Sequence, residues 1–204
     1  MGAVGIAALR RVRTPQELPL AATPLLFALQ QSTEGLLWLN LPQAPNGPTS
    51  IVLTFVFLSF AETFWPIYAP VAVWLIEPNT RRRQLMLVCL AAGAGVGIYL
   101  FWWIVTRAHD AAIVDGHIVY MTESGHSYAV GLAYLAATAL PLLLSSQRTV
   151  FALGAIVLAG STIAYVFYWE RFVSVCCFFA AAASVTILCH FEWSHRRRPR
   201  PAEA

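Results

Sequence analysis

Six long apolar runs constrain this chain more than any other feature of its sequence. Each is 17 to 26 residues long, and the runs comprise residues 18–41, 51–76, 84–106, 128–144, 150–168 and 172–190. A helix of about 20 apolar residues crosses the hydrocarbon core of a bilayer. Only 11% of the residues are charged, against roughly 25% in soluble domains. The sequence therefore predicts an all-α, polytopic transmembrane helical bundle rather than a soluble fold.

Residues 1–9 form a further, shorter apolar segment. At a rise of about 1.5 Å per residue, it covers less than half of the ~30 Å hydrocarbon core. A half-span in lipid leaves backbone groups unsatisfied unless neighbouring helices cover it. The sequence therefore favours a chain start upstream of Met1 over a half-helix. In both cases we expect six full spans plus a short or truncated N-terminal helix. This single bundle of residues 1–195 is followed by a basic tail, residues 196–204.

The arginine positions predict how the bundle is oriented. Eleven of the 13 basic residues lie on alternate connections, and all are arginines. They are Arg10, Arg11, Arg13, Arg81, Arg82, Arg83, Arg148, Arg196, Arg197, Arg198 and Arg200. Cytoplasmic connections carry the excess of basic residues in membrane proteins. We therefore expect a seven-helix topology in a bacterial cytoplasmic membrane, with the N-terminus outside and the C-terminus inside. The lipid bilayer surrounds the bundle, and anionic lipids bind the basic tail.

Two carboxylates inside apolar runs are the strongest candidates for a functional role. Gln30 and Glu34 are one helical turn apart and share a face, with Gln31 beside them. Glu62 lies at a similar depth when residues are counted from the outer ends of the runs. Acids at such depth usually face a bundle interior or a wet cavity, so we expect a polar pocket in the outer half of the bundle. The alternatives are a protonated, paired Glu34 and a Glu62 that caps carbonyls freed by a kink at Pro66.

Residues 107–127 form a long outer connection rich in ionisable side chains. It carries the three histidines His109, His117 and His126 and the three acids Asp110, Asp115 and Glu123. We expect a polar loop that roofs the pocket, with residues 118–120 touching the bundle as a lid. The histidines are the candidates for a metal site, but they are separated by eight and nine residues, whereas two ligands on one helix face or strand are normally two, three or four residues apart.

Several classes of protein are excluded by what the composition lacks. The chain has no lysine, which rules out a retinal Schiff base. The four cysteines all lie in apolar runs, where they act as small apolar residues. They are Cys89, Cys176, Cys177 and Cys189. The sequence carries no recognised catalytic signature and no basic patch for a nucleic acid.

Three functions fit these observations. The first is binding, sensing or transport of a small molecule or ion by the polar pocket. The second is a membrane-embedded, metal-dependent enzyme, with one acid as general base. The third is a structural accessory subunit, in which the acids only fix helix contacts. The sequence leaves the cofactor unidentified and leaves open a homo-oligomer or a larger membrane complex.

Motifs spread over nearly the whole chain carry a family resemblance. They are residues 18–38, the pair Trp65-Pro66, and residues 116–120, 134–146 and 176–190. The chain resembles an uncharacterised bacterial family of small multi-pass membrane proteins, known only as a domain of unknown function. The resemblance implies about seven helices and no established activity. It also implies a preceding Met-Cys-Phe-Ser stretch, which this sequence lacks. It marks as first targets for mutation Gln31, Glu34, Trp38, His117 and His190.

Overall fold

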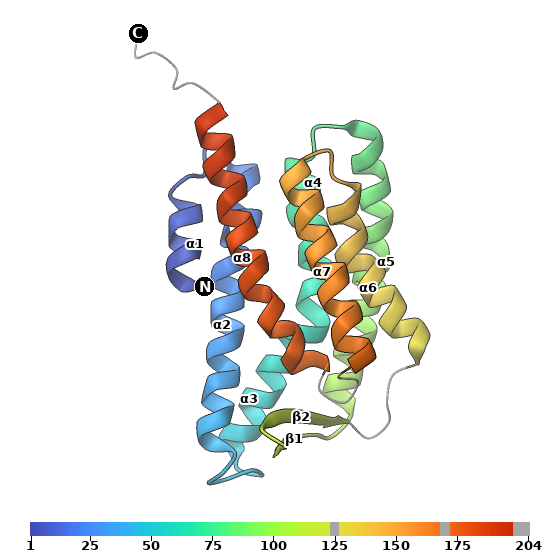
Figure 1. Cartoon of the computed structure of the whole chain (residues 1–204). Helices are drawn as coiled ribbons and strands as arrows, with labels where there is room; N and C mark the ends of the chain where they lie inside the picture. Colours follow the sequence, from blue (N-terminus) through green and yellow to red (C-terminus); the bar gives the residue numbers. More distant parts are fainter. Residues whose placement is uncertain (123–126, 168–171, 198–204) are drawn as a thin grey trace.

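The computed structural model describes residues 1–122, 127–167 and 172–197, which are mostly helical (Figure 1). Within these ranges there are seven helices, if residues 48–76 are counted once, and a single two-stranded sheet. The elements are α1 (Gly2–Leu9), the 3-10 turn η1 (Pro15–Glu17), α2 (Leu18–Asn40), α3 (Pro48–Leu58), the π-helix η2 (Ser59–Phe64), α4 (Trp65–Ile76), α5 (Thr80–Thr106), β1 (His109–Val114), β2 (His117–Thr122), α6 (Tyr128–Leu144), α7 (Arg148–Phe167) and α8 (Phe172–Arg197).

The helices follow the predicted apolar runs to within a few residues at most ends. Helix α5 begins four residues before its run, because the Asn79 side chain caps it by accepting a hydrogen bond from the Arg82 backbone N–H at 3.1 Å. Helix α8 extends beyond its run to Arg197, into the predicted tail. Two helices, Pro48–Ile76 and Thr80–Thr106, are long and apolar enough to cross a membrane.

The short helix α1 packs against its neighbours. Ala8 is fully buried, and a Cβ atom added to Gly5 would lie 2.9 Å from the Leu25 backbone nitrogen of α2. Arg11 at the end of α1 forms an ion pair with Glu192 of α8. Figure 1 shows α1 beside α2 and α8, with Met1 near the middle of the bundle. Neighbouring helices therefore cover α1, and a chain start upstream of Met1 stays a prediction.

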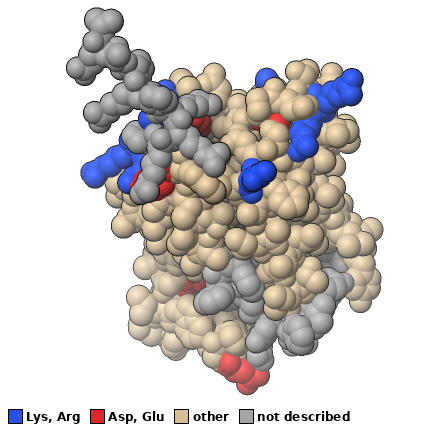
Figure 2. All heavy atoms as spheres, turned by 45° about the horizontal axis from the view of Figure 1, so that its top comes forward, with Lys and Arg blue, Asp and Glu red and all other residues tan. Residues whose placement is uncertain are grey.

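One end of the bundle collects the described arginines of the alternate connections. Figure 1 places the α1–α2, α4–α5 and α6–α7 connections and the C-terminal end of α8 at this end. Arg82 donates from Nη1 to the Leu144 carbonyl at 2.8 Å, which ties the start of α5 to the end of α6. In Figure 2 basic side chains gather in the upper part of the view, and a broad uncharged zone lies below them. We call this the arginine end.

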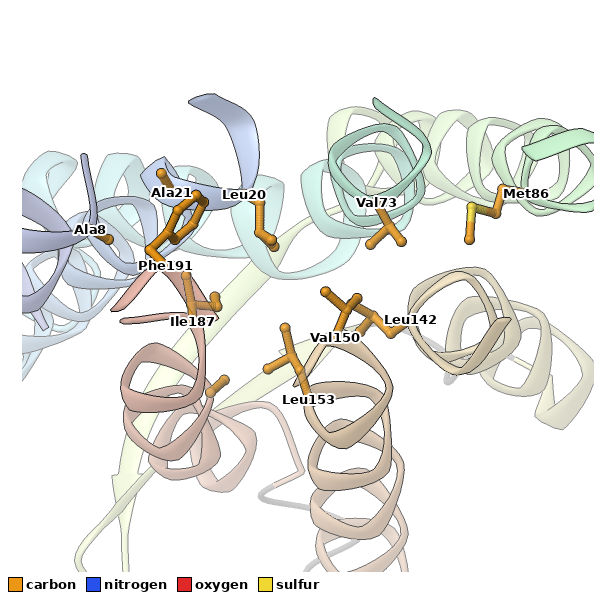
Figure 3. Close-up of a cluster of buried hydrophobic side chains, with 11 residues drawn as sticks. Ala8, Leu20, Ala21, Val73, Met86, Leu142, Val150, Leu153, Ile187 and Phe191 are labelled. Carbon is orange, nitrogen blue, oxygen red and sulfur yellow. The ribbon is translucent and has the colours of Figure 1, made fainter. Parts of the chain in front are cut away.

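Two apolar clusters form the core, one toward each end of the bundle. Figure 3 shows the first, in which side chains from seven helices point toward one another. Its buried members are Ala8, Leu20, Ala21, Val73, Met86, Leu142, Val150, Leu153, Ala183, Ile187 and Phe191. The second cluster joins α2, α3 and the sheet at the opposite end, which we call the hairpin end. Its buried members are Leu37, Leu41, Phe57, Ala61, Ala111 and Ile118.

Strands β1 and β2 correct the all-α prediction, which treated residues 107–127 as a polar loop. They form an antiparallel hairpin with Val114 opposite His117. Asp115 and Gly116 make the turn with positive φ angles of 47° and 74°. An Asp-Gly pair between two short stretches rich in isoleucine and valine is a strong hairpin signal, which the count of polar residues had hidden. Ile118 is fully buried in the second core cluster, so the prediction that residues 118–120 touch the bundle is confirmed.

The π-helix η2 distorts the long helix between α3 and α4. In a π-helix the N–H of residue 66 would donate to the Ala61 carbonyl, but Pro66 has no N–H. The Tyr134 hydroxyl of α6 donates to that carbonyl instead, at 2.6 Å. Helix α5 crosses here in close contact, since a Cβ added to Gly93 would lie 1.9 Å from the Pro66 oxygen. Gly93 and Gly97 therefore let the two helices approach.

Candidate functional site

Two of the polar residues predicted as a site on α2 are deeply buried, although most of their helix is apolar. Gln30 is 4% exposed and Glu34 is 6% exposed, and both lie on one face of α2. The predicted shared face is therefore turned into the protein. Burial of an amide and a carboxylate is costly unless each is hydrogen-bonded, so their partners define the site.

Gln30 is held by the indole of Trp65, the first residue of α4. The Trp65 Nε1–H donates to Gln30 Oε1 at 2.7 Å. The ring of Trp65 also lies against Phe27 of α2, with centroids 4.4 Å apart. The contact joins α2 to the residue that directly follows the π-helix. Gln30 is thus an amide set among aromatic rings, with its oxygen engaged and its orientation defined.

Glu34 is contacted from its own helix and from the hairpin. Gln31 Nε2 donates to Glu34 Oε2 at 3.1 Å, and the Tyr120 hydroxyl lies 3.5 Å from Oε1. The Tyr120 ring stacks on Phe57 of α3, with centroids 4.7 Å apart and an interplanar angle of 9°. Strand β2 therefore positions a phenol over the carboxylate. Gln30, Gln31, Glu34, Trp65 and Tyr120 together are called the Glu34 cluster below.

Glu62 lies on the π-helix and is half-buried. On the same segment, Ser59 Oγ and Thr63 Oγ1 are buried and have no hydrogen-bond partner among the described residues. Eight other helix hydroxyls donate to the carbonyl four residues earlier. They belong to Thr23, Ser32, Thr33, Thr106, Thr138, Thr162, Ser184 and Thr186. The π-helix thus carries unusual polar groups, and π-helices are frequent at functional sites.

The structure settles part of the alternative role considered for Glu62. The Ala61 carbonyl lacks a helical donor because Pro66 has no N–H. It accepts a hydrogen bond from the Tyr134 hydroxyl instead of from Glu62. That Glu62 takes part in ligand binding stays a prediction. Neither Tyr134 nor Tyr120 was chosen from the sequence as a site residue, because each reaches its partner across more than 70 residues of chain.

Trp38 lies one helical turn after Glu34 on α2, whereas His117 lies on the hairpin. The Trp38 side chain is 38% exposed. His117 precedes Ile118, and alternate strand residues point to opposite faces. Because Ile118 and Tyr120 face the bundle, His117 lies on the other face of the hairpin. Their roles as ligand-binding residues stay predictions.

The candidate metal ligands are not brought together. His109 and His117 begin the two strands and lie at opposite ends of the hairpin, roughly 16 Å apart for five residues at ~3.3 Å each. His109 Nε2 lies 3.1 Å from the Ile104 carbonyl, and His126 is outside the described residues. Within the described ranges, no three His, Cys, Asp or Glu side chains gather as metal ligands would.

Glu77, which the sequence analysis did not single out, is the most deeply buried acid of the described chain, at 2% exposure. Its Oε2 accepts from the Ser146 N–H at 2.8 Å and from Ser145 Oγ at 3.1 Å. Its Oε1 accepts from the Asn79 N–H at 3.1 Å. Burial alone would raise the pKa of Glu77, but these hydrogen bonds outweigh it and hold the pKa below its ordinary value. The sequence signal was an acid just before Pro78, at the end of an apolar run.

His190 lies apart from the Glu34 cluster, at the contact between α7 and α8. It is 8% exposed, and its Nδ1 shares a hydrogen bond with Thr149 Oγ1. Its ring also meets Phe191 edge to face, with centroids 5.1 Å apart. The geometry therefore gives His190 a packing role between two helices.

The fold and the buried polar residues together define a class of protein. It is mostly helical, it has two helices that can span a membrane, and a carboxylate and amide cluster is buried under a β-hairpin. The chain belongs to DUF6629, a family of unknown function, which matches residues 1–204. The resemblance to an uncharacterised family is therefore confirmed. No curated protein and no solved structure matches the chain.

Proposed function

We propose that the chain is a multi-pass membrane protein whose arginine end faces the cytoplasm. The outward faces of the helices support this proposal. Large apolar side chains are at least 67% exposed on three different helices, an arrangement that costs free energy in water and none in lipid. They are Leu39, Val88, Ile98 and Leu132.

Reporter fusions test this orientation. Fusions after Pro45 and after Gly116 are expected to report from outside the membrane. Fusions after Arg82 and after Arg197 are expected to report from inside. A reversed result at any one of these positions would contradict the proposed topology, whereas soluble expression of the whole chain would contradict a membrane location altogether.

We further propose that the Glu34 cluster binds a small molecule or ion, so that the protein binds, senses or transports it. The observation that carries this proposal is the contact of a buried helix carboxylate with a phenol from the hairpin. Intramembrane acids are expensive and usually functional. The 3.5 Å separation between the Tyr120 hydroxyl and Glu34 is long for a hydrogen bond, so a ligand group can replace that contact at little cost.

The chemistry of the cluster favours a ligand with hydrogen-bond donors or a positive charge. Glu34 offers two acceptor oxygens, and the amides of Gln30 and Gln31 offer both donors and acceptors. The rings of Phe27, Trp65 and Tyr120 surround these groups, and aromatic faces attract cations. Glu62 extends this polar set if it faces the same space, as the sequence predicts.

Native mass spectrometry of gently purified protein, with metal analysis and an absorbance spectrum of the same sample, tests the binding proposal. We expect a co-purifying mass that is lost from the Glu34→Gln variant and reduced in the Glu62→Gln variant. Glu17→Gln is the matched control, because Glu17 is a carboxylate in the connection at the opposite end. Unchanged ligand content in a folded Glu34→Gln variant would contradict binding at this cluster. Stable co-purification of a larger complex would instead favour an accessory subunit.

A further inference from the structure

Three exposed arginines at the starts of α5 and α7, at the arginine end of the bundle, form a basic surface, which we call the arginine patch. Arg81 and Arg82 lie in the first turn of α5, and Arg148 is the first residue of α7. All three side chains are exposed. Among the described residues, none of the three forms an ion pair; the pair that is seen joins Arg11 to Glu192 on other helices.

The connections that carry the patch are tied to each other. Ser145 and Ser146 both bond to Glu77, and Gln147 Nε2 donates to the Ile76 carbonyl at 2.8 Å. Arg82 itself reaches the Leu144 carbonyl, four residues before Arg148. The connection that leads into α7 is therefore held against the end of α4 and the start of α5, with the Arg82 guanidinium bonded beside it.

The electrostatics of this area call for an anion. The N-terminus of a helix carries a partial positive charge and unpaired N–H groups, so cations there are unfavourable and anions are favourable. Here arginines lie in the first turn of α5, which begins at Thr80, and at the first position of α7. The oxygens of Glu77 beneath the patch already accept hydrogen bonds from Asn79, Ser145 and Ser146. The exposed guanidinium groups can therefore bind a phosphate that approaches the surface of the protein.

Large apolar side chains lie one turn below the patch and are also exposed. Leu85 follows Arg82 by three residues and is 53% exposed, and Phe151 follows Arg148 by three residues and is 50% exposed. Val88 continues the α5 side at 68% exposure. Counted from its start, each of the two helices therefore presents an arginine and then, one turn further on, an exposed apolar side chain. This order matches the phosphate and acyl chains of a phospholipid.

A stacked arginine marks the depth of this surface. Arg83 lies over the ring of Trp74, with its guanidinium carbon 4.4 Å from the ring centroid. Tryptophan rings favour the level of the lipid headgroups. The arginine patch lies on the same turn of α5 and so at the same level, where an anionic headgroup is available.

We propose that the arginine patch binds the phosphate of an anionic phospholipid, whose acyl chains run along Leu85, Val88 and Phe151. The proposal depends on the membrane location argued above and is independent of ligand binding by the Glu34 cluster. The site differs from the predicted lipid site on the basic tail, residues 196–204, most of which lies outside the described residues.

The test uses the full chain in nanodiscs of phosphatidylcholine alone, or of three parts phosphatidylcholine to one part phosphatidylglycerol. Native mass spectrometry of protein released from the discs counts the lipids retained. We expect the wild type to retain phosphatidylglycerol preferentially. In the double variant Arg81→Gln, Arg148→Gln this preference is expected to fall by roughly 30-fold, because two surface arginines are removed. Arg82 is kept because it bonds to Leu144.

Arg107→Gln is the matched control, because Arg107 lies at the opposite end of α5, over the Trp103 ring. Its preference is expected to equal that of the wild type. An unchanged preference in the double variant would overturn the proposal, as would equal losses in both variants. Inorganic phosphate that displaces the lipid at millimolar concentration would point to a soluble phosphate ligand and would also overturn it. A chain that inserts into neither bilayer contradicts the membrane location itself.

Discussion

Two buried carboxylates at opposite ends of the molecule are held in different ways. Glu77, at the arginine end, is 2% exposed and accepts from two backbone N–H groups and one serine hydroxyl. Glu34, toward the hairpin end, is 6% exposed, and the donors seen on it are the Gln31 amide and the Tyr120 phenol. Burial is thus alike, whereas the kind of donor differs.

The difference teaches how burial alone can mislead a search for functional acids. Backbone donors in two tied connections cannot leave Glu77 without unfolding those connections, so Glu77 serves the structure. Side-chain donors rotate about their own bonds, so those on Glu34 can give way to a ligand. The acid with movable partners is therefore the better candidate for function, although it is slightly more exposed.

The largest effect on stability is expected at the close contact between α4 and α5, which lies between the two ends of the bundle. Gly93→Ala would place a Cβ atom 1.9 Å from the Pro66 carbonyl oxygen, so α4 and α5 must separate. We expect a loss of about 3 kcal/mol in the free energy of unfolding, at the upper end of typical overpacking costs. Thermal unfolding in detergent measures it.

Gly95→Ala is the control for this substitution, since nothing lies within 4 Å of a Cβ added there. It is expected to leave stability unchanged or to raise it slightly, because alanine favours helix more than glycine. Equal losses in the two variants would show that the helix itself, rather than its contact with Pro66, is sensitive.

Glu77→Gln is expected to cost about 2 kcal/mol of stability, because it removes charge-assisted hydrogen bonds and sets an amide N–H₂ against existing donors. Glu34→Gln is expected to cost clearly less, and Glu17→Gln, at a half-buried position, almost nothing. Denaturant unfolding of the three variants provides the comparison. If Glu34→Gln were as destabilising as Glu77→Gln, the contrast between the two acids would be wrong.

The pH dependence of unfolding sharpens the same contrast. The pKa of Glu77 in the folded protein lies below its ordinary value of 4.5. The stability that Glu77 contributes is therefore complete above that pH and is lost as the pH falls through the folded-state pKa. We expect the wild type to lose stability on acidification and Glu77→Gln to lose less. Parallel curves for the two proteins would contradict a charged Glu77.

A smaller effect is expected for Gly116→Ala in the hairpin turn. Gly116 has a φ angle of 74°, which alanine adopts at a cost of about 1 kcal/mol. Hydrogen exchange of the amides in β2 is expected to become faster, with no change in the helices. Asp115→Asn keeps a residue that tolerates positive φ and is expected to exchange at the wild-type rate. Faster exchange throughout the bundle would instead show that the hairpin stabilises the helices as well.

The smallest effect on stability is expected for Tyr120→Phe. The substitution keeps the stacking on Phe57 and removes a hydroxyl 3.5 Å from Glu34, so it costs about 0.5 kcal/mol or less. If the Glu34 cluster binds a ligand, its content measured by native mass spectrometry changes in this variant although stability does not. A large loss of stability would mean that Tyr120 holds Glu34 as firmly as the backbone holds Glu77.

Local patterns predicted the helices better than they predicted the rest. The run of residues 128–144 matches α6, and α2 matches its run within one residue, because apolar length is a property of the segment itself. The hairpin was missed because polar residues outweighed the Asp-Gly signal. The π-helix was missed because its register depends on Pro66 together with Tyr134, 68 residues later.

By itself, the sequence determined where the helices run and which connections carry the arginines, since both follow from composition over 20 or so neighbouring residues. Tertiary structure alone decided which polar groups meet. Gln30 bonds to Trp65, 35 residues later, and Glu34 contacts Tyr120, 86 residues later. Glu77 bonds to Ser145 and Ser146, 68 and 69 residues later. No local period encodes such pairs, because they arise only when packing of the apolar faces brings the helices and the hairpin together.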